Sequence, residues 1–187
     1  MSELTETQIA LDNFVTRALS QRDLGCFTQS HDPEWLSPCE QKVENGTSFW
    51  KPQRQTENLD FSGLANAVES PIHVDIQEYY SFFWSGTLLG KTSEGPLSLI
   101  QVWNTEDFTR LLENLIGHLF NKIRSKSPFT VFIANTEEDS ELFLSVDNET
   151  GVVLLEDPSS GPIREVAANL HSFLDRIEPD TREAEIY

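Results

Sequence analysis

The longest regular apolar pattern in this chain runs from residue 108 to residue 123. Apolar side chains recur there every three or four residues, as they do along one face of an α-helix. They are Phe108, Leu111, Leu112, Leu115, Ile116, Leu119, Phe120 and Ile123. Asn104 or Thr105 is a suitable cap at the start, and Pro128 limits the end. The pattern predicts a long central helix whose broad apolar face is buried by the rest of the fold.

Shorter helical and strand patterns lie on both sides of this helix. Helical spacing predicts further helices over residues 7–22, 60–68, 72–84 and 163–177. Asp60 is the expected cap of the second, and a strand is the alternative for the third because its aromatic residues suit both. Short or alternating apolar runs predict strands over residues 87–91, 97–103, 129–134, 142–146 and 152–155. We expect the first two and the last two strands to pair as hairpins, and the middle one to lie inside a sheet.

Residues 25–58 show neither pattern, because prolines and a glycine recur among polar residues. We predict a long ordered loop there, held by its aromatic side chains, with a short strand at residues 48–50. The order of elements describes an α+β fold rather than alternating α/β. A mixed or antiparallel sheet would pack against the long central helix and the N- and C-terminal helices. The 187 residues suit a single domain, expected over 1–180, with a solvated tail over 181–187.

The chain is strongly acidic, with 31 Asp and Glu against 13 Lys and Arg and a formal net charge of −18. Its hydrophobic content of 38% is ordinary, so the acids belong to a folded domain rather than a disordered tail. Such a domain repels nucleic acid and anionic lipid. It attracts basic surfaces over about a Debye length, roughly 8 Å at physiological salt. The charge therefore indicates a surface that binds a basic partner.

Motifs for catalysis and for metal binding are absent from the sequence. The four histidines are not spaced as zinc ligands, and Cys26 and Cys39 are lone thiols that we expect to be reduced. Nucleophile elbows and phosphate-binding loops do not occur. A hydrolase using Glu113 and His118 is a weaker alternative, because a satisfied, partly buried histidine better fits the apolar stripe. We expect no enzymatic activity, no metal and no cofactor.

Six acids are the candidates for the partner-binding surface. Glu137, Glu138 and Asp139 directly follow the apolar segment 129–134, where a rigid strand would present them in a loop. Glu113 comes from the central helix, and Glu69 and Glu78 come from the region before it. Solvated surface charge is the alternative for such residues.

Aromatic side chains near these acids are candidates for apolar anchors. Interfaces commonly depend on a few buried aromatic side chains at their centre. Tyr80, Trp84 and Trp103 are the candidates, with packing in the core as the alternative for each.

The N-terminus lacks the pattern of a signal peptide, and no apolar run reaches the ~18 residues that a membrane span needs. We therefore expect a cytoplasmic protein. We also expect a monomer.

Several short segments resemble one known family. Residues 113–119 (ENLIGHL) resemble the central helix of the Syd family, the SecY-interacting proteins of bacteria. Further matching segments are 66–69 (NAVE), 50–52 (WKP), 37–39 (SPC), 132–134 (FIA) and 168–170 (ANL). In order and spacing the resemblance covers about residues 8–178. It implies a SUKH-type α+β fold, no known enzymatic activity, and binding of the cytoplasmic loops of SecY through a concave electronegative groove.

The resemblance and the charge agree on one physical point. A chain of net charge −18 does not dock on an anionic membrane by itself, so association with the inner membrane would require a protein receptor. Cytoplasmic loops of membrane proteins are rich in Lys and Arg. The expected function is regulation or quality control of the SecYEG translocase from its cytoplasmic side. An immunity protein of the same superfamily, which neutralises a basic nuclease toxin, is the alternative.

Overall fold

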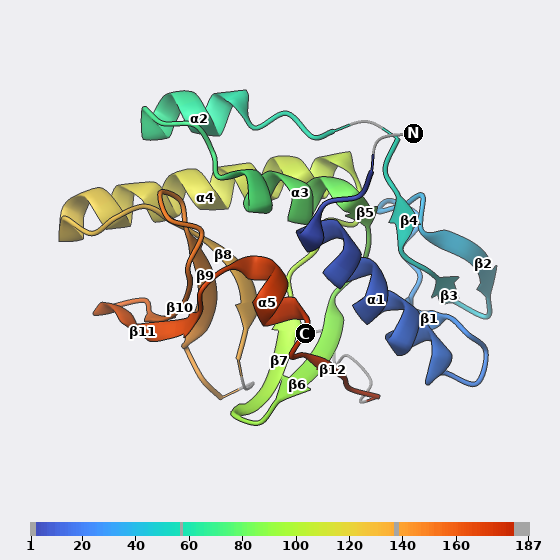
Figure 1. The fold of residues 1–187 in the computed structure, drawn as a ribbon. Helices are drawn as coiled ribbons and strands as arrows, with labels where there is room; N and C mark the ends of the chain where they lie inside the picture. Colours follow the sequence, from blue (N-terminus) through green and yellow to red (C-terminus); the bar gives the residue numbers. More distant parts are fainter. Residues whose placement is uncertain (1–2, 57, 137–138, 182–187) are drawn as a thin grey trace.

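The computed structural model describes residues 3–56, 58–136 and 139–181, which form an α+β fold (Figure 1). The helices are α1 (Glu6–Ser20), α2 (Ser62–Val68), α3 (Val74–Phe82), α4 (Thr105–Ser125) and α5 (Leu170–Leu174). The strands are β1 (Phe27–Ser30), β2 (Glu40–Glu44), β3 (Thr47–Trp50), β4 (Gln53–Arg54), β5 (Phe83–Trp84), β6 (Leu88–Thr92), β7 (Gly95–Leu99), β8 (Thr130–Asn135), β9 (Phe143–Asp147), β10 (Val153–Asp157), β11 (Gly161–Ala167) and β12 (Glu178–Pro179). The predicted fold class is confirmed. The tail residues 182–187 lie outside the described residues.

A seven-stranded antiparallel sheet forms the centre of the fold, in the order β11-β10-β9-β8-β7-β6-β12. Both predicted hairpins are confirmed as β6–β7 and β9–β10. The apolar strand β8 lies between β9 and β7, and its residues Val131 and Ile133 are fully buried. The prediction that this segment is an interior strand is therefore confirmed.

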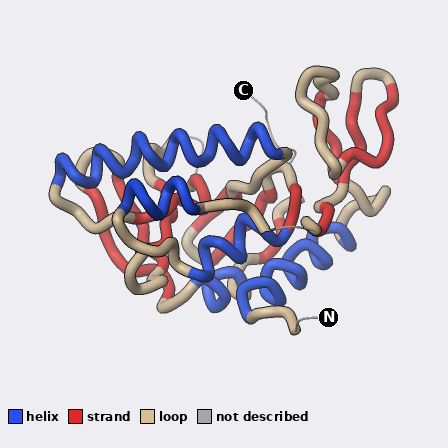
Figure 2. The backbone as a smooth tube through the Cα atoms, turned by 90° about the horizontal axis from the view of Figure 1, so that it is seen from above, coloured by secondary structure: helices blue, strands red, loops and turns tan. Residues whose placement is uncertain are grey.

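The central helix α4 lies along one side of the large sheet, and α1, α3 and α5 lie along the other (Figure 1, Figure 2). The start of α4 is fixed by Asn104, whose Oδ1 accepts a hydrogen bond from the Asp107 backbone N–H at 2.9 Å. The short helix α2 covers a further part of α4, and the rings of Phe61 and Phe108 meet edge to face at 5.1 Å. The long predicted helix is thus confirmed.

The predicted burial of a broad apolar face on α4 is confirmed for most of the stripe but not for its last two side chains. The side facing the sheet centres on Leu111, Leu115 and Leu119, which are at most 7% exposed. Phe120 and Ile123 are 62% and 61% exposed. Successive residues of a helix lie about 100° apart around its axis. The residue directly after a buried one therefore points away from the sheet when only one sheet covers the helix. Helical spacing alone did not separate these two side chains from the buried row.

The segment predicted as a loop over residues 25–58 contains a small sheet, whose strands lie between residues 27 and 50. Strands β1, β3 and β2 pair antiparallel in that order, and the expected strand at residues 48–50 is part of β3. One face of this sheet packs on the core, where Trp50 stacks on Phe27 with ring centroids 4.5 Å apart. Strand β2 is half-buried only at Glu40 and otherwise exposed, so its sequence carries no apolar alternation that would have predicted it.

The predicted C-terminal helix over residues 163–177 is mostly wrong. Residues 161–167 form the edge strand β11, which pairs with β10 and contains two register shifts. A helix begins only after Asn169, whose side chain accepts a hydrogen bond from the Ser172 backbone N–H at 3.0 Å. Strand β10 has peptide groups along both edges, and β11 satisfies the edge that β9 leaves open. Sheet pairing therefore overrides the three-four spacing in the first half of this segment.

The shorter helices agree with the sequence with small corrections. The predicted helix 7–22 is α1. The predicted helix 72–84 is α3, which ends at Phe82, and the last two residues of the prediction form the strand β5 instead. Helix α2 begins after Phe61 rather than after Asp60. Asp60 nevertheless accepts a hydrogen bond from the Ser62 backbone N–H at 2.8 Å, so it still satisfies an open donor of the first turn.

Candidate partner-binding surface

The acids that follow β8 occupy the connection between β8 and β9. Asp139 is exposed there, whereas Glu137 and Glu138 lie outside the described residues. Because β8 pairs with a strand on each side, this connection leaves a well-fixed part of the sheet. Ser98 of β7 pairs with Asn135 of β8, so the β6–β7 turn lies at the same end of the strands as the β8–β9 connection. Loops at such ends are where a rigid scaffold presents binding residues.

The three helical acids come from different places. Glu113 is exposed on the solvent side of α4, and Glu69 is exposed at the end of α2 with a left-handed backbone. Glu78 of α3 is half-buried and accepts a hydrogen bond from the Thr5 hydroxyl at 2.7 Å. Helix α3 starts beside the β9–β10 turn. This turn lies at the end of the strands opposite to the β8–β9 connection. The candidate acids therefore occupy more than one face.

Two of the three candidate anchors are core residues. Tyr80 is fully buried and its hydroxyl donates a hydrogen bond to the Phe132 carbonyl oxygen at 2.6 Å. Trp103 is 4% exposed and its indole N–H donates to the Trp35 carbonyl oxygen at 2.9 Å. Trp84, in β5, is half-buried. Packing in the core, the alternative reading, describes Tyr80 and Trp103.

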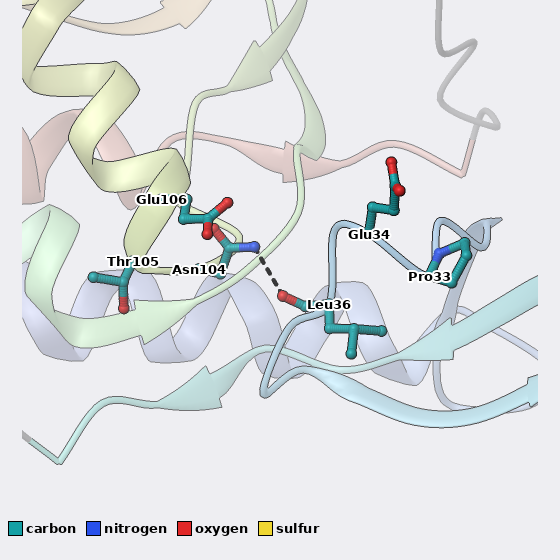
Figure 3. A pocket seen from close by; sticks show the side chains of 6 residues that line it. All are labelled: Pro33, Glu34, Leu36, Asn104, Thr105 and Glu106. Carbon is teal, nitrogen blue, oxygen red and sulfur yellow. Dashed lines mark hydrogen bonds between the residues drawn. The ribbon is translucent and has the colours of Figure 1, made fainter.

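A small acidic cavity opens where α4 begins (Figure 3). It has a volume of about 330 Å³ and is lined by Pro33, Glu34, Leu36, Asn104, Thr105 and Glu106. The Asn104 side-chain amide donates a hydrogen bond to the Leu36 carbonyl oxygen at 2.8 Å, which ties the loop before β2 to the helix. Arg110 stacks over the Trp35 ring at 4.0 Å and holds the same loop from the next turn. Two carboxylates, those of Glu34 and Glu106, thus line this concave site.

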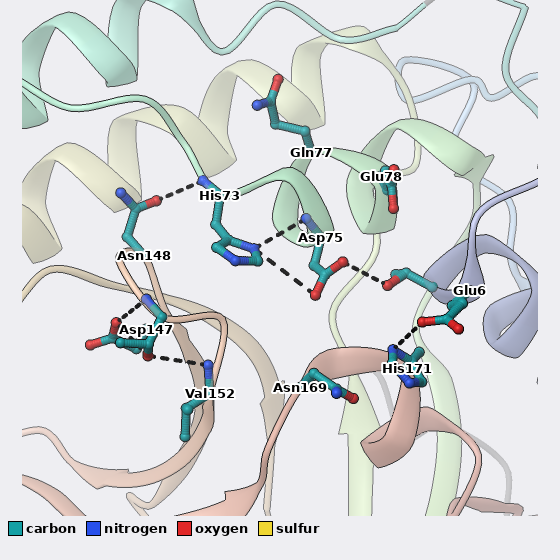
Figure 4. Close-up of polar contacts among 12 residues, drawn as sticks. Glu6, His73, Asp75, Gln77, Glu78, Asp147, Asn148, Val152, Asn169 and His171 are labelled. Carbon is teal, nitrogen blue, oxygen red and sulfur yellow. Dashed lines mark hydrogen bonds and ion pairs between the residues drawn. The ribbon is translucent and has the colours of Figure 1, made fainter.

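A second polar region joins α1, α3, α5 and the β9–β10 turn (Figure 4). Asp75 accepts a hydrogen bond from the Thr7 hydroxyl at 3.0 Å, and the Glu6 carboxylate lies 3.5 Å from the His171 ring nitrogen. The His73 backbone N–H donates to the Asn148 side chain at 3.1 Å. These contacts hold three helices and a turn together, so the acids here have a structural role.

Comparison with known proteins decides the family. The sequence model of the family described as Syd protein (SUKH-2) matches residues 8–179. The chain belongs to the Syd family. It is 39% identical over 178 residues to the Protein Syd of Pseudoalteromonas atlantica, covering 92% of this chain and 95% of that protein. It is 36% identical over 183 residues to the Protein Syd of Hahella chejuensis, covering 96% and 92%. The Protein Syd of Alteromonas mediterranea is 36% identical over 171 residues, covering 90% and 94%.

The histidines of this Syd-family chain have structural partners. The His118 ring nitrogen lies 2.9 Å from the Thr130 hydroxyl, which confirms a satisfied, partly buried histidine. Burial lowers the pKa of His118 and the nearby Lys122 lowers it further, against the opposing effect of Glu156. Glu113 is exposed on the solvent side of the same helix while His118 faces β8, so the two form no acid–base pair.

Both cysteines are free thiols, as expected. Burial raises the pKa of Cys39 to about 11, so that thiol stays protonated. Among the described residues there is no group of three or more His, Cys, Asp or Glu side chains that could hold a metal ion. Within the same part of the chain, none of the helices combines the length and the apolar character needed to cross a bilayer.

Sequence reasoning missed the carboxylate of Glu34, which lines the acidic cavity with Glu106. The presence of Glu106 at the start of a helix is explained by the helix dipole, which a carboxylate there stabilises by about 0.3–1 kcal/mol, so there was no reason in the sequence to look for a partner. Glu34 sits in a segment predicted as a plain loop, and no pattern in the sequence brings it to the start of α4. The Trp35–Pro38 neighbourhood, rich in aromatic and proline residues, was the available signal of an ordered segment.

Two glycines with the same backbone conformation separate the effects of strain and contact. Gly46 and Gly151 both have φ of +76°, but a Cβ at Gly46 meets no atom within 4 Å, whereas a Cβ at Gly151 lies 2.6 Å from the His73 ring. Gly46→Ala should therefore cost only the conformational penalty of about 1–2 kcal/mol. Gly151→Ala should cost at least about 1 kcal/mol more, because His73 accepts the Asp75 N–H that caps α3. Urea unfolding of both variants measures the difference, and equal losses would contradict it.

Proposed function

We propose that this chain binds the basic cytoplasmic loops of SecY through acidic surface residues, and so regulates or checks the SecYEG translocase from the cytoplasmic side of the inner membrane. The observation that carries the proposal is membership of the Syd family over residues 8–179. The net charge of −18 supports it, because the loops of a membrane protein that face the cytoplasm are rich in Lys and Arg. The chain would then reach the membrane through its protein partner.

The engagement of the few basic side chains also supports an acidic docking surface. Arg54 pairs with Asp12, Lys122 with Glu156 and Arg164 with Glu94. Arg17 donates to the Ile177 carbonyl oxygen at 2.9 Å. Among the residues that the structure describes, most exposed carboxylates therefore form no ion pair with a cation of the same chain. A cluster of such carboxylates focuses the field and speeds encounter with a basic segment.

Two places are the best candidates for the contact. One is the β8–β9 connection, with Asp139 and, in sequence, Glu137 and Glu138. The other is the acidic cavity at the start of α4, where Glu34 and Glu106 flank the apolar side chain of Leu36. A Lys or Arg side chain fits such a cavity, since its stem packs on apolar atoms while its charge meets the carboxylates. The helical acids Glu69, Glu78 and Glu113 are the remaining candidates.

Charge reversal at these two places tests the proposal. Binding to membranes that contain SecYEG should weaken as salt rises from about 50 to 300 mM, because exposed charge attraction is screened. Glu137→Lys/Glu138→Lys and Glu34→Lys/Glu106→Lys change the charge equally, and at least one should weaken binding about tenfold or more. The matched control is Glu149→Lys/Glu165→Lys, at two other exposed acids.

The outcomes are distinct. If all three double variants lose affinity equally, the attraction is a diffuse field and neither place is the docking site. If the wild type does not bind SecYEG membranes but captures a small basic toxin from the soluble fraction, the proposal fails in favour of the immunity function.

A further inference from the structure

The solvent side of α4 carries four residues in one line. Glu113, Gly117, Phe120 and Arg124 are separated by four, three and four positions, which places them on one face of a helix. All four are exposed, and the face is opposite to the buried row of Leu111, Leu115 and Leu119. Phe120 is 62% exposed, although large aromatic side chains are mostly buried in folded proteins.

The fold itself gives no reason for the composition of this face. A Cβ at Gly117 would meet no atom within 4 Å, so no close packing inside the chain requires glycine there. Glycine in a helix interior costs about 1 kcal/mol relative to alanine. Within the described part of the chain, neither Glu113 nor Arg124 forms an ion pair or a side-chain hydrogen bond. These residues are available to a partner.

We propose that this face is the contact between two copies of the chain, packed through antiparallel α4 helices about a twofold axis. The order of the four residues is self-complementary. The midpoint between Gly117 and Phe120 is also the midpoint between Glu113 and Arg124. An axis through that point places Phe120 of one copy over Gly117 of the other, and Glu113 of one copy beside Arg124 of the other. A twofold contact requires such matching of a patch with itself.

The chemistry of the contact follows from these pairs. The Phe120 ring occupies the space left by the missing side chain of Gly117, as a knob fits into a hole between helices. Ile123, which is 61% exposed, and the half-buried Ile116 extend the apolar contact on one flank. Two Glu113–Arg124 pairs close the ends and fix the antiparallel register. The proposed contact differs from the monomer that was expected from the sequence.

Association through one helix pair should be weak. A single pair buries less than the ~1,600 Å² of a standard interface, and two chains of net charge −18 repel each other. A dissociation constant on the order of 10–100 µM is expected at physiological salt. Raising the salt from about 10 to 150 mM shortens the Debye length from roughly 30 to 8 Å, so it should strengthen the dimer. Binding of a basic SecY loop has the opposite salt response, so either proposal can fail without the other.

Sedimentation velocity from about 1 µM to 1 mM tests the dimer with three variants. Gly117→Leu should raise the dissociation constant at least tenfold while keeping or raising the unfolding temperature, because it fills the hole with a better helix former. Glu113→Arg and Arg124→Glu should each weaken the dimer about tenfold, since like charges then meet at both ends.

The double variant Glu113→Arg/Arg124→Glu is the matched control, and it should restore most of the affinity because opposite charges face each other again. A chain that stays monomeric up to about 1 mM would overturn the proposal. So would a double variant no tighter than the single ones. Loss of SecYEG binding in Gly117→Leu, with a wild type that never dimerises, would assign this face to another protein and also overturn it.

Discussion

Lys122→Met is expected to destabilise the native state by about 3–5 kcal/mol. Lys122 is 5% exposed on the sheet side of α4, and its ammonium group bonds the carboxylate of Glu156 in β10. Glu156 is 1% exposed and also accepts a hydrogen bond from the Ser145 hydroxyl at 2.5 Å. Removing the lysine leaves a carboxylate buried without its cation, and the cost of that desolvation is no longer offset. Urea unfolding followed by tryptophan fluorescence measures the loss.

Two controls separate burial from charge. Lys122→Met/Glu156→Leu removes both charges and should recover most of the lost stability, since apolar replacement of a buried pair is often neutral. Arg54→Met breaks the exposed pair between Arg54 and Asp12, which should cost no more than about 1 kcal/mol. A loss in Lys122→Met no larger than that in Arg54→Met would contradict the burial of this pair.

The buried pair of Lys122 and Glu156 makes the free energy of unfolding depend on pH. Burial alone would raise the pKa of Glu156, but hydrogen bonds from Lys122 and Ser145 outweigh it and hold the pKa below its ordinary value. The unfolded chain therefore binds this proton more readily than the native one. The stabilisation is fully present above the unfolded pKa, about 4.3, and is lost as the pH falls through the lower native value. Unfolding of the double variant, which lacks the carboxylate, should depend less on pH in this range.

Periodic segments were predictable from the sequence because their burial is regular. Helix α4, both hairpins and the interior strand β8 each bury one face or both faces continuously, and the apolar pattern records that burial. The pattern does not record which neighbour covers the face. A helix covered by one sheet and the short α2 leaves Phe120 exposed, and only the tertiary structure shows this.

One of the two missed strand regions had another signal in the sequence. Asn45 and Gly46 both have positive φ, at 51° and 76°, and form the two-residue turn between β2 and β3. Asn-Gly between two strands is a strong hairpin signal, and the prediction of a loop over residues 25–58 did not use it. Strand β11 had none, because its residues are mostly exposed and its pairing is set by the open edge of β10.

The candidate site was predictable in its chemistry and not in its position. Net charge follows from composition, so an acidic surface could be expected from the sequence alone. Which acids share a face depends on how distant segments meet. Glu34 and Glu106 are 72 positions apart and line one cavity, because Asn104 bonds the Leu36 carbonyl oxygen. Glu78, by contrast, is held against Thr5.

Trp103→Ala is expected to lower the free energy of unfolding by about 3–5 kcal/mol rather than to weaken partner binding selectively. The Trp103 ring meets Trp50 edge to face at 5.4 Å, and its backbone carbonyl oxygen accepts a hydrogen bond from the Ser37 hydroxyl at 2.5 Å. With its indole N–H bonded to Trp35, it joins the small sheet, the loop before β2 and the start of α4. Truncation would leave a large cavity at this junction, and urea unfolding measures the cost.

Trp84→Ala is the matched comparison. Because Trp84 is half-buried, its truncation should lower the free energy of unfolding clearly less than truncation of Trp103 does. Binding of both variants to SecYEG membranes, measured where each is still folded, completes the test. If Trp103→Ala unfolds at nearly the wild-type urea concentration yet binds at least tenfold more weakly, Trp103 is an interface anchor. If stability falls by several kcal/mol and the variant binds like the wild type where it is still folded, Trp103 is a core residue and not an interface anchor.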